Sequence, residues 1–391
     1  MSKHKLLILG TRGIPGRNGE LETFAERLAL YLTQRGWRVT VYCQGKEERL
    51  VYSIWQGINL VHIPVPKNNS FWSVLFDLKA ALHAARQEGL ILTLGYNTAA
   101  FSLLYRLKNR VNMTTMNGME WLKVKWNALE KSWLYVNEKC AALFSNYLIA
   151  EHPEIEHYLR TEVQTNKPIS VIPSTAKAVT EADETLLEQY KLLSQKYSLL
   201  NALPEPENSI LEIVSAFSRR KRNMTLVVTG KYMPKKNDYH KQVLESASDE
   251  VMFIGKIRDR EILRSLQYYS SLYLHGHQMG GSNKSSIEAM SAGNPILAHD
   301  NCFNYGVVGS AAVYFKDVAD CDAKLTQLLK DKQKLQTMSK NSLARYYAEF
   351  ADDKDLKAHE ELFLSLIDRN YFVSAKEDNS QKAKSLVQNS K

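Results

Sequence analysis

The feature that most constrains the fold is a regular alternation of short apolar runs with helical patterns. Residues 5–9 (KLLIL) form one such run, and after them Leu21, Phe24, Leu28 and Leu32 recur at spacings of three and four. Strands that alternate with helices indicate βαβ units and a parallel sheet. In the first half we predict strands at 5–9, 37–43, 59–63, 90–94, 111–116 and 146–150, and helices near 21–32, 74–88, 97–107 and 127–145.

The same alternation restarts in the second half, around a polar segment at 176–195. There we predict strands at 169–172, 196–200, 224–229, 251–254, 271–275 and 295–298, and helices at 207–219, 236–247, 258–268, 285–292, 322–350 and 354–368. We therefore expect two doubly wound α/β domains, over 1–165 and 166–350. The segment 374–391 is rich in Lys, Ser, Gln and Asn, and we expect it to be disordered.

Length and composition agree with two domains and an anionic partner. At about 100–200 residues per domain, 391 residues predict two, and 44% hydrophobic residues can fill two cores. The net charge of +9 favours an anionic ligand or surface, but no nucleic-acid-binding module is recognisable and we expect no nucleic-acid partner. We see neither a signal peptide nor an apolar run of membrane-spanning length. The four cysteines form no CxxC pair, which fits a reducing cytoplasm.

The loop after the first predicted strand contains four glycines, at positions 10, 13, 16 and 19. Glycines between a strand and a helix let the backbone approach a ligand closely, and Arg12 and Arg17 add charge suited to phosphate oxygens. The spacing is neither GxGxxG nor a P-loop. The alternative interpretation is an ordinary glycine-rich turn.

A second loop joins a strand to a helix at 276–290. Gly280 and Gly281 free the backbone, and Ser282 or Ser285 can cap the helix. Free amides and the helix dipole at such an end favour a diphosphate. A carboxylate near the first turn, Glu288, can accept hydrogen bonds from ribose hydroxyls. The alternative is that Glu288 is only a favourable first-turn acid.

A third loop, at 117–126, gathers a carboxylate, two tryptophans and two lysines. Together with Lys131, Trp133 and Lys139, this composition suits sugar stacking or contact with anionic lipid headgroups. The alternative is a solvated helix face with buried tryptophans.

His275 and His277 form an H-x-H pair that lacks a third metal ligand nearby, so we expect a hydrogen-bonding role near the ligand and no metal site.

Three segments resemble a known family: LGTRGIPGRNGELETFAERLA, NGMEWLKVKW and HGHQMGGSNKSSIEAMSAGNPILAHDNCFN. They look like the rhamnosyltransferase-type branch of family 4 retaining glycosyltransferases, bacterial enzymes of capsule and O-antigen assembly, over about residues 4–350. The resemblance implies a GT-B fold, in which two Rossmann-like domains face a central cleft, and a C-terminal helix within 351–373 that crosses back to the first domain. It also implies metal-independent transfer with retention and no cofactor, because the nucleotide-sugar is a co-substrate.

The resemblance also implies residue roles. Gly13 matches a loop glycine near the donor phosphates, and Glu288 matches the second glutamate of an E-x7-E motif, which binds the nucleotide ribose; Gly280 occupies the position of the first. The expected donor-binding residues are Gly13, Gly230, Lys231, Gly280, Gly281, Ser282, Asn283, Lys284, Ser285 and Glu288, on the second domain except for Gly13. The expected acceptor-binding residues are Arg12, Arg17, Asn18 and Trp121, and the catalytic candidates are Asn117, Glu120 and His277.

Two positions depart from the branch. Asn117 stands where the branch usually has an aspartate, and Leu203 stands where it usually has an arginine facing the diphosphate, three residues before Pro206. Lys231, Lys256, Arg258 or Lys284 are candidates to replace that charge. These departures indicate an altered donor or acceptor, or weakened activity.

The function that we expect from the resemblance is sugar transfer, best matched by L-rhamnose from dTDP-rhamnose, onto a polyprenyl-diphosphate-linked saccharide. The protein would act in the cytoplasm, peripherally on the anionic inner face of the plasma membrane. The first alternative is a non-catalytic nucleotide-sugar-binding or scaffold protein of the same pathway. A dinucleotide-dependent oxidoreductase is a weaker alternative, because the GxGxxG spacing is missing.

Overall fold

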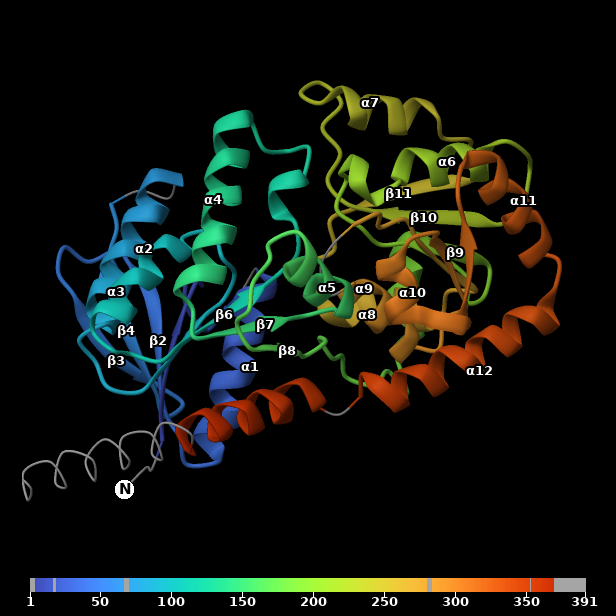
Figure 1. Cartoon of the computed structure of the whole chain (residues 1–391). Helices are drawn as coiled ribbons and strands as arrows, with labels where there is room; N and C mark the ends of the chain where they lie inside the picture. Colours follow the sequence, from blue (N-terminus) through green and yellow to red (C-terminus); the bar gives the residue numbers. More distant parts are fainter. Residues whose placement is uncertain (1–3, 17–18, 67–69, 280–282, 352, 369–391) are drawn as a thin grey trace, which may run out of the picture.

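The computed structural model describes residues 4–16, 19–66, 70–279, 283–351 and 353–368. They form two α/β domains that lie side by side; the helix at 332–349 lies beneath the second domain and the helix at 354–368 lies beneath the first (Figure 1). Among the residues described, no helix combines the length and apolarity that crossing a bilayer requires.

The first sheet has eight strands in the order β3-β4-β2-β1-β5-β6-β7-β8, parallel except for β3, which runs antiparallel to β4. The strands are β1 (Lys5–Leu9), β2 (Arg38–Gly45), β3 (Val51–Trp55), β4 (Ile58–Pro64), β5 (Leu90–Thr93), β6 (Asn112–Met116), β7 (Tyr147–Ala150) and β8 (Ile169–Val171). The six strands predicted in this half are all present; most are apolar runs, and β6 is buried although it contains Asn112, Thr114 and Thr115.

Two strands of this sheet differ from expectation. β3 was missed: it is an exposed edge strand, paired to β4 through a turn in which Gln56 and Gly57 have φ of 47° and 82°. β8 was expected to begin the second domain, but it pairs in parallel with β7 and completes the first sheet. The helix that makes this crossover, α5 (Pro153–Thr161), was also missed, and the boundary at 165 is therefore placed too early.

Helices pack on both faces of the first sheet. They are α1 (Glu20–Gln34), α2 (Ser70–Ala84), α3 (Ser102–Leu107), α4 (Ala128–Phe144) and α5, with short 3-10 turns η1 (Ala99–Phe101) and η2 (Glu120–Leu122). α1 buries Ala25, Leu28 and Leu32 in the core, the face that the sequence spacing predicts. A capping box starts α4, in which Asn127 Oδ1 accepts from the Glu130 amide and Glu130 Oε2 accepts from the Asn127 amide.

The second sheet is entirely parallel, with strand order β11-β10-β9-β12-β13-β14. Its strands are β9 (Tyr197–Leu200), β10 (Thr225–Thr229), β11 (Val251–Gly255), β12 (Leu272–His275), β13 (Ile296–His299) and β14 (Ala312–Phe315). Its helices are α6 (Ile210–Ser218), α7 (Asp238–Glu245), α8 (Arg260–Tyr268), α9 (Lys284–Ser291), α10 (Cys302–Val308), α11 (Val318–Leu328) and α12 (Lys332–Glu349), with 3-10 turns η3 (Glu184–Tyr190), η4 (Pro206–Asn208) and η5 (Gly309–Ala311). The single helix predicted over 322–350 is two helices, because Asp331 caps a new start at α12.

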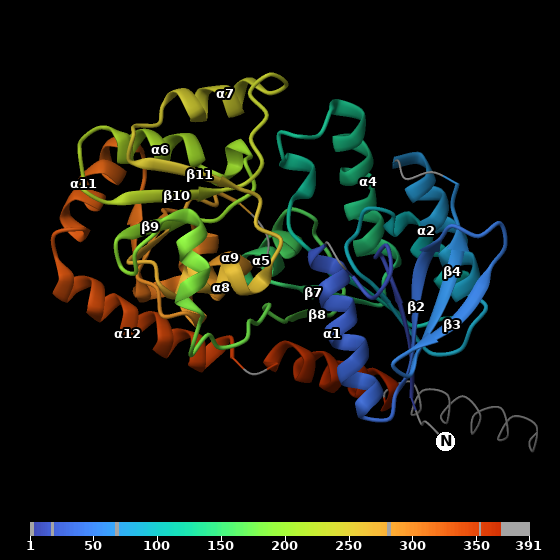
Figure 2. The ribbon, with the colours of Figure 1, turned by 180° about the vertical axis from the view of Figure 1, so that it is seen from behind.

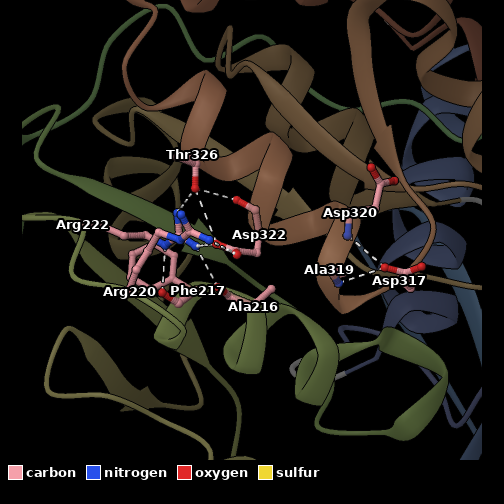
Figure 3. Close-up of polar contacts among 9 residues, drawn as sticks. All are labelled: Ala216, Phe217, Arg220, Arg222, Asp317, Ala319, Asp320, Asp322 and Thr326. Atoms are coloured by element: carbon pink, nitrogen blue, oxygen red, sulfur yellow. Dashed lines mark hydrogen bonds and ion pairs between the residues drawn. The ribbon is translucent and has the colours of Figure 1, made fainter.

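A buried ionic cluster joins α6 to α11 (Figure 3). The Arg222 guanidinium lies 2.6 Å from Asp322 Oδ1 and also donates to the carbonyls of Ala216 and Phe217 at the end of α6, at 2.7 and 2.8 Å. Arg220 contacts the other oxygen of Asp322 at 2.5 Å. The side chains of Arg222 and Asp322 are only 3% and 7% exposed. The cluster therefore satisfies helix-end carbonyls and a buried charge together.

The chain returns to the first domain through the helix at 354–368. Leu356 and Phe363 from this helix belong to the core cluster that contains Leu6 and Leu28. Arg27 of α1 contacts Asp353 at 2.7 Å and Asp355 at 3.3 Å, where the chain passes from the second domain back to the first. The segment 374–391, for which we expected disorder, lies outside the described residues.

Candidate functional site

A cleft of about 710 Å³ opens between the domains. Its walls come mainly from the loops that follow β9, β10, β11 and β12 and from the start of α9; the first domain contributes Glu20 and Lys123. Ligands of open parallel sheets bind beyond the carboxyl ends of the strands, which is where this cleft lies. α8 meets α1 near the centre of the molecule (Figure 2), where Arg260 donates to Thr23 Oγ1 at 3.1 Å.

Most of the expected donor residues that the structure describes line this cleft. They are Gly230, Lys231, Asn283, Lys284, Ser285 and Glu288, and the catalytic candidate His277 joins them. Gly280, Gly281 and Ser282 lie outside the described residues. Gly13 does not line the cleft. A Cβ at this position would lie 2.8 Å from Cys43 Cβ, so a glycine is needed here because β2 packs closely against it.

Glu288 points from α9 toward the cleft. The helix begins at Lys284, after Asn283 with φ of 43°, so Glu288 lies in the second turn and not the first. Ser285 lies within the helix and is not its cap, which corrects that part of the expectation. Burial raises the pKa of Glu288; Glu20 raises it further, whereas Lys284 and Arg260 lower it.

Three residues that line the cleft carry buried polar atoms without a hydrogen-bond partner. Both carboxylate oxygens of Glu207, Nε2 of His275 and Oδ1 of Asn283 are buried and have no hydrogen-bond partner within the described part of the chain. A buried polar group left unpaired costs about 1–3 kcal/mol. Their concentration along one wall indicates a place where a polar ligand supplies the missing partners. Glu207 was not predicted as a site residue, although it directly follows Pro206, the reference position for the missing arginine.

The His277 ring is held in one orientation. Asn208 Nδ2 donates to the Leu203 carbonyl at 2.9 Å, so Asn208 Oδ1 is an acceptor and His277 Nδ1, at 2.6 Å, is the donor. The His277 carbonyl accepts from Asn301 and Asn304, each at 2.8 Å. Beside it, burial lowers the pKa of His275 to about 3, so that ring is neutral.

Among the described residues that line the cleft, four lysines offset four glutamates. The lysines are Lys123, Lys231, Lys256 and Lys284, and the glutamates are Glu20, Glu205, Glu207 and Glu288. Three of the four cations proposed to replace the branch arginine are therefore present; Arg258 is not among the lining residues. Leu203 itself lies at the rim with 61% of its surface exposed. Burial raises the pKa of Glu205. The charge of Lys125 lowers this pKa, and the charge of Glu207 raises it.

The third predicted loop contributes Lys123 to the cleft, and its other residues lie outside the lining. The Glu120 carboxylate contacts Lys123 at 2.5 Å and Lys125 at 3.3 Å, and accepts from the Trp126 indole at 3.4 Å. These contacts pair the Glu120 carboxylate with two cations of its own loop, which leaves it poorly placed to act as a base. Trp121 packs edge to face with Tyr135 of α4, with ring centroids 5.4 Å apart.

Asn117 lines a smaller neighbouring cavity of about 60 Å³, which shares Glu20 and Lys284 with the main cleft. Its Oδ1 accepts from Thr115 Oγ1 at 3.3 Å. The expected catalytic residues therefore separate: His277 lies in the cleft, Asn117 behind it and Glu120 in the adjacent loop.

The glycine-rich loop is bound to α1. The backbone amide of Arg12 donates to Glu22 Oε1 at 2.9 Å, and that of Gly16 donates to Glu26 Oε2 at 2.8 Å. These two amides are thus engaged by carboxylates of the protein, which the glycine pattern did not predict. The Arg12 side chain is exposed, and Arg17 and Asn18 lie outside the described residues.

Comparison with protein families divides the chain in two. Residues 3–175 match the Domain of unknown function DUF1972, and residues 204–345 match Glycosyl transferases group 1. The cleft loops from Leu203 to Glu288 fall almost entirely within the second match. A comparison with curated proteins found no match.

Solved structures show the same architecture. Sucrose-phosphate synthase from Thermosynechococcus elongatus is 17% identical, with a TM-score of 0.79 over 94% of this chain and 100% of that one. HepE from Anabaena, in complex with UDP and glucose, is 15% identical, with a TM-score of 0.71 over 93% and 100%. Trehalose 6-phosphate synthase from Burkholderia multivorans is 10% identical, with a TM-score of 0.71 over 95% and 98%. The fold is GT-B, with two Rossmann-like domains, as expected.

Proposed function

We propose that this protein is a glycosyltransferase that binds a nucleotide-sugar in the cleft around Glu288. The observation that carries the proposal is the row of unpartnered buried atoms on Glu207, His275 and Asn283 along one wall. That wall belongs to the segment that matches Glycosyl transferases group 1. A ribose ring supplies hydroxyl donors for Glu288, and a diphosphate supplies acceptors for the cleft lysines.

The proposed chemistry is transfer through an oxocarbenium-like transition state. As the glycosidic bond to the diphosphate breaks, negative charge develops on the leaving nucleoside diphosphate. The N-terminal amides of α9 and the ammonium group of Lys284 stabilise that charge. We propose retention, in which the leaving diphosphate takes the proton of the acceptor hydroxyl on the same face of the sugar. This route needs no protein nucleophile, and it is compatible with a Glu120 carboxylate that is ion-paired within its own loop.

For the donor we propose dTDP-L-rhamnose, on the strength of the three segments that resemble the rhamnosyltransferase-type branch. Because the Anabaena relative binds UDP and glucose, UDP-glucose is the natural comparison ligand. A ligand that binds only the native state raises its stability, by about 2.7 kcal/mol at a concentration 100 times its Kd. The donor is thus identified by the largest rise in melting temperature.

For the acceptor we propose a polyprenyl-diphosphate-linked saccharide, presented at the anionic inner face of the plasma membrane. Support comes from the exposed face of α4, which stands at the top of the first domain (Figure 1). Leu129, Trp133, Val136 and Leu143 form a stripe at helical spacing and are 83%, 43%, 54% and 61% exposed. We call these four residues the α4 stripe. Exposed apolar stripes flanked by lysines, here Lys131, are typical of helices that lie on anionic membranes.

The test of the proposal pairs binding with transfer. Wild-type protein is expected to be stabilised by one nucleotide-sugar and to transfer its sugar to a lipid-linked acceptor, whereas Glu288→Gln loses nucleotide-dependent stabilisation. The matched control is Glu261→Gln on α8, whose carboxylate pairs with Arg264 on the surface and lies outside the cleft. If no nucleotide-sugar binds, or if both variants behave alike, the proposal is wrong.

The second candidate function is a non-catalytic nucleotide-sugar-binding or scaffold protein. The observations that favour it are the engagement of Glu120 by two lysines and the amide at position 117 in place of a carboxylate. Binding of a nucleotide-sugar to the wild-type protein without transfer to any acceptor would select this function.

A further inference from the structure

A loop of the first domain contributes one lysine to the cleft. The walls of the cleft belong almost entirely to the second domain, and the described residues that the first domain adds are Glu20 and Lys123. Lys123 directly follows η2 in the loop at 117–126, and its side chain is 27% exposed. This side chain therefore lines the cleft from the opposite domain.

The backbone of this loop is fixed by a buried tyrosine. Tyr96 is 1% exposed, and its hydroxyl donates to the Gly118 carbonyl at 2.7 Å and accepts from the Glu120 amide at 2.8 Å. A tyrosine hydroxyl that both donates and accepts in this way has its hydrogen-bonding capacity used within the fold. The Tyr96 hydroxyl thus holds Glu120 in place, and with it the lysines that pair with Glu120.

Glu120 orients Lys123 and leaves it able to bind an anion. Glu120 Oε2 lies 2.5 Å from Lys123 Nζ, and Glu120 Oε1 lies 3.3 Å from Lys125 Nζ. One carboxylate faces two ammonium groups, so this set of charges stays positive. An ammonium group has three N–H donors, and Lys123 can keep its contact with Glu120 while it donates to a phosphate oxygen. Lys125 lies over the Trp126 ring, 4.8 Å from its centroid, and does not line the cleft.

The lysines of this loop lie near the segment in which the expected arginine is missing. Leu203 occupies the position of that arginine, and residues 203–205 line the cleft together with Lys123. Burial raises the pKa of Glu205, and the charges of Lys125 and Lys123 lower it, so both ammonium groups lie within electrostatic range of this segment. A diphosphate bound beside Glu205 needs a compensating cation, because like charges repel. The first domain places such a cation in the cleft.

We propose that Lys123 binds the donor diphosphate from the first domain and supplies the positive charge that Leu203 leaves missing on the second. The inference rests on the proposed function, because it adds a residue to the nucleotide-sugar site. A diphosphate held between Lys284 on α9 and Lys123 bridges the two domains. The site is then complete only when the domains face each other across the cleft, which couples donor binding to domain closure.

The test measures the Kd of UDP and of dTDP for the full-length protein by isothermal titration calorimetry. One of these nucleotides is expected to bind the wild type, and its Kd is expected to rise about tenfold in Lys123→Gln, because a charge-assisted hydrogen bond is lost. The matched control is Lys125→Gln, which removes the same charge from the same loop outside the cleft. Its Kd is expected to stay within about twofold of the wild type, because solvent and salt screen an indirect charge.

A second variant tests whether Lys123 replaces the missing arginine. Leu203 lies at the rim with 61% of its surface exposed, so an arginine fits there without disturbing the core. The double variant Leu203→Arg/Lys123→Gln is expected to bind the nucleotide within about threefold of the wild type, because the cation now comes from the second domain. A mere distortion of the 117–126 loop would not be rescued from the opposite wall of the cleft.

Three results would overturn the role of Lys123. They are an unchanged Kd in Lys123→Gln, equal weakening in Lys123→Gln and Lys125→Gln, and no recovery in the double variant with Leu203→Arg. Glu288→Gln is titrated alongside and reports on the proposed donor site itself. Loss of the nucleotide in Glu288→Gln but not in Lys123→Gln leaves the donor site standing without Lys123, whereas failure of both nucleotides to bind the wild type contradicts the proposed function.

Discussion

His277 Nδ1 lies 2.6 Å from Asn208 Oδ1, and this hydrogen bond ties the loop after β12 to η4 along the wall of the cleft. Asn208 is itself oriented by the Leu203 carbonyl, so Leu203 and Asn208 together orient the His277 ring. A close approach of the backbones accompanies the bond: a Cβ on Gly276 would lie 2.1 Å from the Asn208 carbonyl oxygen. The geometry of this wall therefore depends on both His277 and Asn208.

We expect Asn208→Ala to weaken nucleotide-sugar binding about fivefold, because loss of one hydrogen bond of about 1 kcal/mol releases the His277 ring. Isothermal titration calorimetry measures the change. Asn59→Ala, in the first domain, removes an amide that lies far from the cleft and is expected to leave the Kd unchanged. An unchanged Kd in Asn208→Ala would show that the ring orientation does not matter for binding.

Binding of the nucleotide is expected to weaken as pH falls. Burial raises the pKa of Glu288, so this carboxyl gains its proton at a higher pH than an exposed glutamate does. The protonated form is a poorer acceptor for ribose hydroxyls. UDP-glucose is the suitable probe, because its diphosphate diester has no proton to gain near neutral pH.

The measurement is the Kd of UDP-glucose from pH 8 down to about pH 5. The wild type is expected to lose affinity over the lower part of this range, and Glu288→Gln is expected to bind weakly with a flat profile. Parallel profiles in the two proteins would exclude Glu288 as the titrating ligand.

The Arg222–Asp322 cluster is expected to dominate the stability of the second domain. Removing one partner of a buried ion pair leaves an uncompensated charge and costs about 3–5 kcal/mol. We therefore expect Asp322→Ala to lower the free energy of unfolding by about 3 kcal/mol in urea titrations. The control is Asp320→Ala, which breaks a more exposed pair with Lys324 and is expected to cost less than about 1 kcal/mol. Equal losses of unfolding free energy in Asp322→Ala and Asp320→Ala would contradict the dominant role of the Arg222–Asp322 pair.

The same cluster predicts an acid dependence. Burial raises the pKa of Asp322, but the hydrogen bonds and charges of Arg220 and Arg222 outweigh it, so the folded pKa lies below the ordinary value. A depressed carboxyl pKa stabilises the fold above the unfolded pKa, and that stabilisation is lost as pH falls through the folded value. Wild type is thus expected to lose stability below about pH 4 more steeply than Asp322→Ala does.

The α4 stripe is expected to bind anionic membranes. The double variant Leu129→Gln/Val136→Gln removes two of its four exposed apolar side chains and is expected to reduce co-sedimentation with vesicles of phosphatidylglycerol and phosphatidylethanolamine severalfold. Raising the salt concentration is expected to release the wild type, because the lysine contribution is screened. Leu193→Gln, an equally exposed leucine on the second domain, is the control. Identical sedimentation of all three proteins would remove the membrane proposal.

Most parallel strands of both sheets were predictable because they are short runs of mainly apolar residues between helical patterns, but β14, which pairs in parallel with β13, was not predicted. β3 was missed because all of its residues before Trp55 are exposed, so no burial pattern marks it. β8 was predicted as a strand but placed in the wrong domain, because three half-buried residues do not show which sheet they join. The donor loop at 276–290 was predictable for a similar local reason: its glycines, amides and carboxylate are close in sequence.

The amino-acid sequence alone determined the two α/β domains and the loop that carries Glu288, since strand and helix periodicity and a loop before a helix are local properties of the chain. Only the tertiary structure decided how distant groups meet. It placed the unpartnered carboxylate of Glu207 in the wall of the cleft and paired the Glu120 carboxylate with two lysines of its own loop. Burial, charge pairing and pKa depend on neighbours that are far apart along the chain, so these properties appear only when the sheets and helices pack.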